Sequence, residues 1–95
     1  MQLLFFHATY CPPCKGMETV ARQYAEETGI SLYTFRVDDV YGGSEMARSH
    51  KVKRLPCLIL ADETGAERTR TEAVHTLETL RIAFNDFMRG GNHNE

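Results

Sequence analysis

Apolar and polar positions follow two different periods along this 95-residue chain, and together they predict seven elements. Strands are predicted by four short runs of apolar, β-branched or alternating residues, at 2–6, 30–37, 57–61 and 66–70. Helices are predicted by apolar residues at helical spacing, at 12–28, about 44–51 and about 76–90. The first and third strands are apolar enough to be buried on both faces, whereas the polar fourth strand suits a sheet edge.

Turn and cap residues agree with these boundaries. Pro12 and Pro13 suit the first turn of a helix, where a fixed φ is already helical, and Gly29 suits the position after its end. Residues 62–65 have the composition of a turn, so the third and fourth strands are expected to form a hairpin.

Two later helices are predicted to begin at hydroxyl N-caps, Ser44 and Thr76. The last helix is expected to bury one apolar stripe, made of Leu77, Leu80, Phe84, Phe87 and Met88. Residues 90–91, both glycine, are expected to end it.

Composition narrows the class of protein. The length suits one domain, expected over residues 1–91, with a frayed tail at 92–95. The net charge is −2, and acidic and basic residues are interspersed along the chain, so the sequence does not indicate binding to nucleic acid or to a membrane. The first residues have no basic segment before the apolar run, so the chain as given is expected to stay in the cytoplasm, as a monomer.

The segment Cys11-Pro12-Pro13-Cys14 carries the chemistry. It follows an apolar strand and opens a helix, which places Cys11 where the helix dipole and unpaired backbone amides favour a thiolate. An ordinary thiol with a pKa of ~8.5 is only about 3% ionised at pH 7, so this stabilisation matters for reactivity. Cys14 begins the buried stripe of the helix. The sequence therefore predicts a redox pair in which Cys11 attacks and Cys14 resolves the mixed disulfide.

The element order and two motifs resemble the thioredoxin fold, an α/β fold with a four-stranded mixed sheet flanked by helices in the order β-α-β-α-β-β-α. Residues 10–15, Tyr-Cys-Pro-Pro-Cys-Lys, look like the aromatic-Cys-x-Pro-Cys-Lys signature of thioredoxins. Residues 47–57 are similar to the family's pattern leading into its cis-proline, which places Pro56 at that position.

This resemblance implies a thiol–disulfide oxidoreductase without a cofactor or a metal. Protein disulfides are the implied substrates, and a thioredoxin-reductase-type enzyme is the implied electron donor. Tyr10, Pro12, Pro13, Leu55 and Pro56 are then expected to form the substrate-binding surface.

Several residues depart from the family pattern. Phe5 stands where thioredoxins usually carry a buried acid, so the proton of Cys14 must leave through water, His7 or another route. For His7, packing is preferred to proton transfer. Glu72 and Ala73 stand where the family has a glycine, which predicts a narrower or more acidic groove. The chain also lacks the first strand and helix of full thioredoxins and so matches the smaller core of glutaredoxins.

Three alternatives remain open. The first is a glutaredoxin-like, glutathione-dependent reductase, although the glutaredoxin motifs around the cis-proline are missing. The second is a redox-inert module that keeps the fold to bind a partner. The third is a metal site built from Cys11, Cys14, Cys57 and His7, disfavoured because a second Cys-x-x-Cys is absent. Cys57 is expected to be a buried structural thiol.

Overall fold

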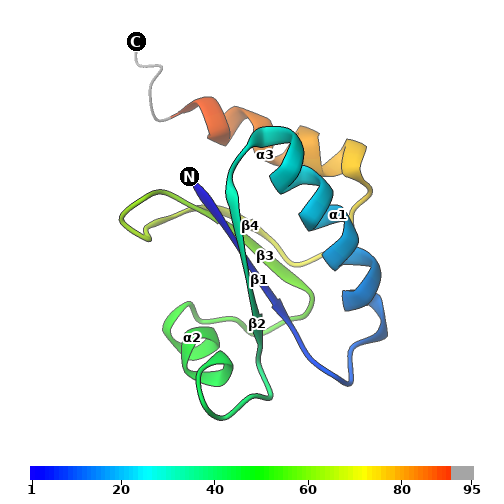
Figure 1. The fold of residues 1–95 in the computed structure, drawn as a ribbon, viewed down its shortest axis with the longest axis vertical. Coiled ribbons are helices and arrows are strands. Elements are labelled where there is room, and N and C mark those ends of the chain that lie inside the picture. The colour runs from blue at the N-terminus through cyan, green and yellow to red at the C-terminus, as the bar shows by residue number, and fades with distance from the viewer. Residues whose placement is uncertain (91–95) are drawn as a thin grey trace.

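Two buried strands, β1 (Gln2–His7) and β3 (Cys57–Ala61), form the centre of a four-stranded sheet with the order β2-β1-β3-β4 (Figure 1). The structure is a computed structural model and describes residues 1–90, so the predicted tail at 92–95 lies outside the described residues. β2 (Ser31–Arg36) pairs parallel to β1, and β4 (Glu67–Thr71) pairs antiparallel to β3 at the opposite edge. The predicted fold class and the edge position of the fourth strand are confirmed.

The strand β1 is buried on both faces, as its composition predicted. Leu3 and Phe5 belong to one core cluster, and Leu4 and Phe6 belong to a second cluster on the other face of the sheet. All four side chains are at most 5% exposed. Because side chains alternate along a strand, this one segment contributes to both cores.

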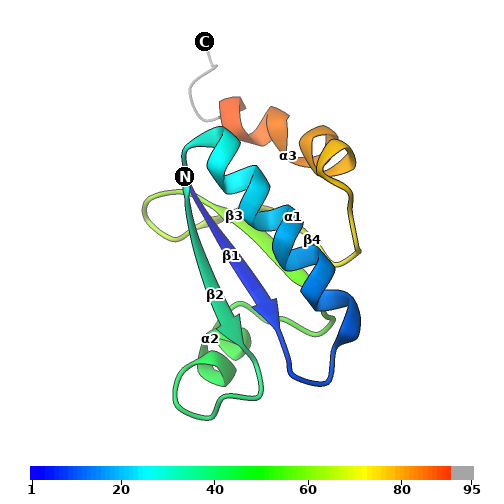
Figure 2. The ribbon, with the colours of Figure 1, turned by 45° about the vertical axis from the view of Figure 1, so that its right-hand side comes forward.

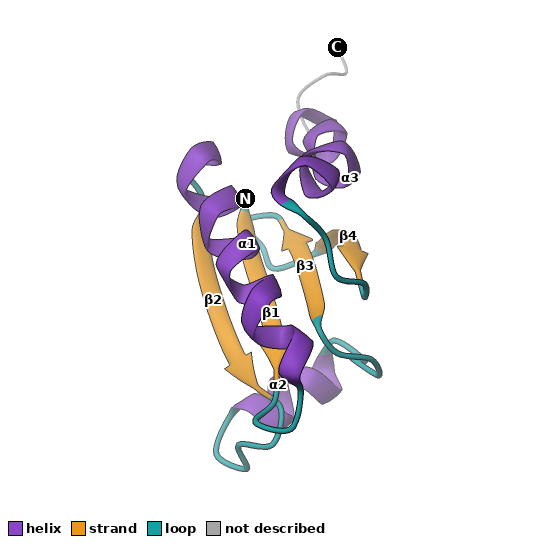
Figure 3. Cartoon of the chain, turned by 90° about the vertical axis from the view of Figure 1, so that its right-hand side faces the viewer, coloured by secondary structure: helices purple, strands orange, loops and turns teal. Residues whose placement is uncertain are grey.

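Helices cover the two faces unequally. α1 (Pro12–Thr28) and α3 (Leu77–Gly90) lie on one face, while α2 (Gly43–Ser49) lies on the other (Figures 2 and 3). The Tyr24 hydroxyl of α1 donates a hydrogen bond of 2.6 Å to Asn85 Oδ1 of α3, which joins these two helices. Within residues 1–90 no helix is long and apolar enough to cross a membrane.

The ends of α1 and α3 follow their predicted signals. α1 spans the predicted residues, and Gly29 caps it with a φ of 74°, a left-handed conformation that glycine adopts without a steric penalty. Thr76 caps α3, because its Oγ1 accepts a hydrogen bond of 3.1 Å from the Thr79 amide.

The start of α2 differs from the prediction. Gly42, not Ser44, is the N-cap, and the helix begins at Gly43 without a side-chain cap. A Cβ atom at Gly43 would lie only 1.9 Å from the Arg36 carbonyl oxygen. The close approach of the two backbones therefore requires glycine there and begins the helix one residue before the serine.

The apolar stripe of α3 also differs in one residue. Leu80 and Phe84 are fully buried, and Leu77 and Met88 pack against the same core cluster. Phe87 is 41% exposed and lies outside that cluster. Its helical position suits the stripe, but its ring lies at the margin of the face that the sheet and α1 cover.

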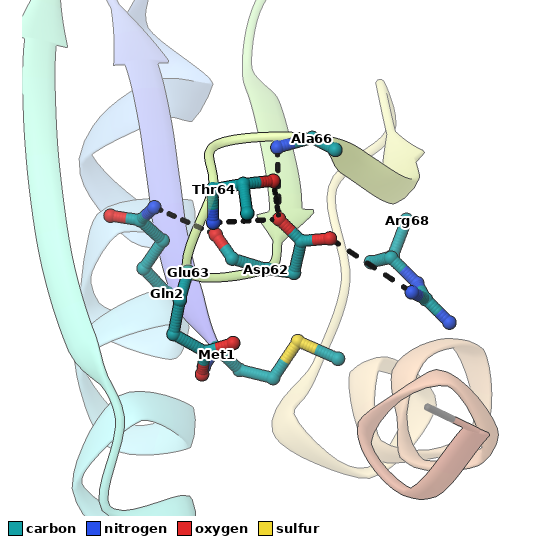
Figure 4. Close-up of polar contacts among 7 residues, drawn as sticks. All are labelled: Met1, Gln2, Asp62, Glu63, Thr64, Ala66 and Arg68. Carbon is teal, nitrogen blue, oxygen red and sulfur yellow. Dashed lines mark hydrogen bonds and ion pairs between the residues drawn. The ribbon is translucent and has the colours of Figure 1, made fainter. Parts of the chain in front are cut away.

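The turn between β3 and β4 is organised by the Asp62 carboxylate (Figure 4). Asp62 Oδ1 accepts hydrogen bonds from the Thr64 amide, the Thr64 hydroxyl and the Ala66 amide, at 2.9, 2.6 and 3.0 Å. The Thr64 hydroxyl is the main cause that holds the pKa of Asp62 below its usual range. The Asp62 carbonyl in turn accepts a hydrogen bond of 2.9 Å from the Gln2 side chain, so the hairpin turn is joined to the start of β1.

Cys57 is buried on the face that α2 covers, opposite to the face that contains Cys11 and Cys14. Burial raises the pKa of the Cys57 thiol to about 11. Arg70 Nη1 lies 3.9 Å from its sulfur, while Arg70 Nη2 donates to the His50 carbonyl at 2.6 Å. The predicted buried thiol is confirmed, and the sheet separates it from the other two cysteines.

The protonation of Cys57 yields a prediction for stability in the oxidised protein. The folded thiol keeps its proton up to pH of about 11, whereas the unfolded thiol loses it near 9, so stability falls as pH rises through this window. We expect Cys57→Ala to lower the free energy of unfolding by about 1–2 kcal/mol at pH 7 through lost packing. Between pH 7 and 10, wild type should lose about 1 kcal/mol more than the variant.

Urea unfolding of both proteins at the two pH values measures this difference. Tyr24 also has a raised pKa, of about 12, but it is present in both proteins and cancels in the comparison. An equal loss of stability in wild type and variant would contradict the assignment to Cys57.

Candidate functional site

The two motif cysteines meet at the junction between β1 and α1. Cys11 is the N-cap residue of α1, and Cys14 lies in its first turn. Their sulfurs form a disulfide, with the two Cα atoms 5.4 Å apart. A turn precedes the pair, in which the Cys11 amide donates to the Ala8 carbonyl at 3.2 Å. The sequence places both thiols here because a strand end is followed at once by a helix start.

The two cysteines differ in exposure less than the sequence predicted. Cys11 is 9% exposed and Cys14 is 2% exposed. Cys11 is therefore buried although Pro12 and Pro13 after it are exposed, because both cysteines belong to the core cluster on the α1 face. The order of exposure is still the predicted one, with Cys14 the more sheltered of the two.

A pocket of about 420 Å³ opens beside Cys11. Its lining combines both sides of the strand-to-helix junction with the segment before β3, namely Tyr10, Cys11, Pro12, Pro13, Lys53 and Leu55. Tyr10 is 70% exposed, whereas Leu55 is half-buried. Cys14 does not line this pocket, so a molecule in it contacts Cys11 rather than Cys14.

Pro56 has a different place from the other predicted site residues. The Leu55–Pro56 peptide bond is cis, as the resemblance implied. Pro56 itself is buried and does not line the pocket, while its neighbour Leu55 does.

Lys53 is a pocket residue that sequence reasoning missed. It lies two residues before Leu55, and both side chains line the same pocket. No sequence period indicated it, because residues 54–56 form bends before β3 begins at Cys57.

A hydrogen bond fixes the loop that precedes Cys11. Thr9 Oγ1 donates to Asp38 Oδ2 at 2.8 Å, which connects this loop to the segment after β2. The Thr9 hydroxyl is the first cause that holds the pKa of Asp38 below its usual range, and Arg36 adds to it from 3.3 Å. No sequence signal indicated this contact, because the two residues are 29 positions apart.

The backbone around Cys11 offers fewer amides to a thiolate than predicted. An N-cap side chain usually accepts from the N–H of the second or third helical residue. Pro12 and Pro13 occupy the first two positions and have no N–H, and the Cys14 amide donates to the Cys11 carbonyl at 3.1 Å. The helix dipole remains as the favourable influence of α1 on the Cys11 sulfur.

The position of the family's buried acid is filled by an apolar ring. Phe5 is fully buried, and the His7 ring stacks on it with centroids 5.6 Å apart, which is the packing role preferred for this histidine. Among residues 1–88, the side chains whose burial is described, no charged group is buried. Cys14 therefore has no buried carboxylate beside it.

The narrower or more acidic groove expected from Glu72 and Ala73 stays a prediction, although neither residue is part of the pocket beside Cys11. Glu72 does not line the pocket, and its carboxylate lies 3.6 Å from Arg70 Nη1. The charged residue in the lining is Lys53. Glu72 pairs with Arg70 of the edge strand β4, from which it is separated by one residue.

The alternative metal site is not assembled among the described residues. Cys57 lies across the sheet from Cys11 and Cys14, which are bonded to each other. No three His, Cys, Asp or Glu side chains of residues 1–90 come together as a metal site would require.

Comparisons with known proteins agree with this geometry. The family model described as Thioredoxin matches residues 1–85. Thioredoxin H2-1 of Oryza sativa subsp. japonica is 33% identical over 82 residues, which cover 80% of this chain and 57% of that protein. A thioredoxin of Mycolicibacterium smegmatis is 37% identical over 59 residues, covering 61% of this chain and 53% of that protein.

A solved structure shares the fold. The structure of thioredoxin 1 from Thermosipho africanus TCF52B superposes with a TM-score of 0.80 at 17% identity, covering 97% of this chain and 99% of that one. This chain spans somewhat more than half the length of the two curated relatives. The match over residues 1–85, together with the cysteine pair at the strand-to-helix junction, shows that the chain belongs to the thioredoxin family.

Proposed function

We propose that this protein is a thiol–disulfide oxidoreductase that reduces protein disulfides, with Cys11 as the nucleophile and Cys14 as the resolving thiol. One observation carries the assignment of roles: Cys11 lines the open pocket, whereas Cys14 is nearly inaccessible and within bonding reach of Cys11. Membership of the thioredoxin family supports the class of reaction.

The first step forms a mixed disulfide. In the reduced protein, the Cys11 thiolate attacks one sulfur of the substrate disulfide, and a new bond forms between these two sulfurs. The substrate S–S bond breaks, and its other sulfur leaves as a thiolate that takes up a proton.

The second step releases the substrate. Cys14 loses its proton, and its thiolate attacks the Cys11 sulfur, which closes the Cys11–Cys14 disulfide and expels the second substrate thiol. The substrate gains the two electrons and two protons that the protein dithiol loses. Because no charged side chain of residues 1–88 is buried, we infer that the Cys14 proton passes to water or to the leaving thiolate.

Repeated turnover needs a donor that reduces the Cys11–Cys14 disulfide again. We propose a thioredoxin-reductase-type enzyme for this role, in the reducing environment of the cytoplasm. The same open pocket would expose the Cys11 sulfur to this donor.

A turnover assay tests the reaction class. We expect reduction of insulin disulfides with dithiothreitol, and with NADPH and thioredoxin reductase, and none with Cys11→Ser. Turnover only in a glutathione-coupled assay would instead support the glutaredoxin-like alternative. Absence of turnover with a folded protein would leave the redox-inert binding module.

A trapping experiment tests the roles of the two thiols. Cys14→Ser should accumulate a mixed disulfide between Cys11 and a substrate peptide, because the resolving attack is lost. Cys11→Ser should accumulate none, because neither of the two remaining thiols, Cys14 and Cys57, lines the pocket. Mass spectrometry of the quenched reactions detects the adducts. Faster alkylation of Cys14 than of Cys11 in the reduced wild type would contradict the assignment.

The missing amides at the helix start predict the effect of restoring one. Pro13→Ala supplies an N–H at the second helical position, from which N-cap side chains accept hydrogen bonds. We expect a larger thiolate fraction at Cys11 and faster alkylation near neutral pH, by about two- to five-fold, as a net gain of ~0.5–1 kcal/mol would give.

The matched control is Pro12→Ala, which adds an amide at the first helical position, where it is poorly directed toward the N-cap side chain. Rates of iodoacetamide labelling of reduced proteins compare the two variants. If Pro12→Ala accelerates labelling as much as Pro13→Ala, greater loop flexibility rather than the new amide is the cause.

A further inference from the structure

Positive charge gathers in the segment that approaches the pocket, although the whole chain has a net charge of −2. Residues 46–61 contain four basic side chains and no acidic one, Arg48, Lys51, Lys53 and Arg54. This segment runs from α2 through the cis-proline and along β3. Of its four basic residues, Lys53 is the one that lines the pocket.

Lys53 is an available cation. Its side chain is exposed, and it forms none of the ion pairs found within residues 1–90. Two acidic groups described above have other partners, since Asp38 is held by Thr9 and Arg36, and Glu72 is paired with Arg70. A ligand in the pocket therefore meets one unpaired positive charge.

Besides Lys53, the pocket is lined by Cys11 and by four residues with apolar surface. Tyr10, Pro12, Pro13 and Leu55 provide apolar surface around the Cys11 sulfur, and Lys53 is the only charged residue among the six lining residues. A substrate segment complementary to this surface contains a disulfide sulfur for Cys11, apolar groups for the walls and a negative charge for Lys53.

We propose that the pocket prefers protein disulfides whose attacked cysteine is flanked by acidic residues, and that Lys53 determines this preference by pairing with the acidic side chain. This inference rests on the proposed function and names the substrate class of the same site. Lys53 acts on substrate binding, while Cys11 and Cys14 perform the reaction.

Three peptides with the same intramolecular disulfide test the preference. Their termini are blocked, and the residues that flank both cysteines are Asp, Asn or Lys. Reduced protein is mixed with each peptide, the reaction is quenched with acid, and chromatography gives the second-order rate constant. We expect the Asp peptide to react about two- to five-fold faster than the Asn peptide, and the Lys peptide more slowly, as for an exposed ion pair.

Substitution of the cation identifies the residue responsible. Lys53→Gln should abolish the difference between the Asp and Asn peptides, and Lys53→Glu should reverse it. Raising the salt concentration from about 20 mM to about 300 mM should shrink the wild-type preference, because screening weakens an exposed pair. The quantity compared is the ratio of the Asp-peptide rate to the Asn-peptide rate within each protein, because an effect of Lys53 on the Cys11 thiolate changes both rates alike and cancels in this ratio.

Arg54→Gln is the matched control, because Arg54 is the next residue, is exposed and does not line the pocket. It should retain the preference for the Asp peptide. An equal loss in Arg54→Gln and Lys53→Gln would overturn the assignment to Lys53 and indicate a diffuse effect of net charge.

Two other outcomes would overturn the inference in distinguishable ways. If all three peptides are reduced at the same rate, the preference is refuted while the proposed function stands. If no peptide is reduced, the proposed function fails together with the inference. The reduction rate of oxidised glutathione is measured in parallel. If Lys53→Gln lowers only that rate, Lys53 binds glutathione rather than an acidic protein segment, and the inference is overturned.

Discussion

The burial of β1 on both faces is the constraint on which the rest of the structure depends. Four successive apolar residues, Leu3 to Phe6, leave no side of this strand for water, so helices must cover both faces of the sheet. The strand then ends at His7, and the chain turns directly into α1. The site lies at that turn because α1 begins just beyond the end of this buried strand, with Cys11 as its N-cap and Cys14 in its first turn.

The same two-sided sheet assigns different chemistry to the three cysteines. Cys14 and Cys57 are both buried, but they lie on opposite faces. Cys57 follows the alternation of β3 and points with Ile59 and Ala61 into the cluster under α2. A raised pKa keeps its thiol protonated, and Arg70 lies against its sulfur, so it belongs to the packing of the second core.

The surroundings of Cys11 combine few fixed donors with an accessible positive charge. The two prolines make the helix start rigid but remove the amides that would otherwise face the sulfur. Lys53, in contrast, is exposed and lines the same pocket. A lysine is a charge on a flexible side chain, whereas a backbone amide is a donor with a fixed direction. Electrostatics at this site therefore depends on a side chain from the segment before β3.

Much of the architecture could be predicted from local sequence. The bounds of α1, the caps at Gly29 and Thr76, the buried β1 and β3 and the polar edge strand β4 each follow from a period or a cap residue nearby in the chain. The start of α2 could not be predicted, because Gly43 is required by a backbone contact with Arg36. Phe87 fits the helical period, yet its exposure depends on where the covered face of α3 ends.

For the site, the sequence by itself determined the reactive pair, since Cys11 and Cys14 lie within one helical turn and their order sets which is the more sheltered. Only the tertiary structure decided what surrounds them. The fold of the segment before β3 places Lys53 in the pocket lining. Thr9 forms a hydrogen bond with Asp38, and Glu72 forms an ion pair with Arg70. The physical reason is that periods and caps are local properties of the chain, whereas these contacts join segments whose separation in sequence carries no information about their distance in space.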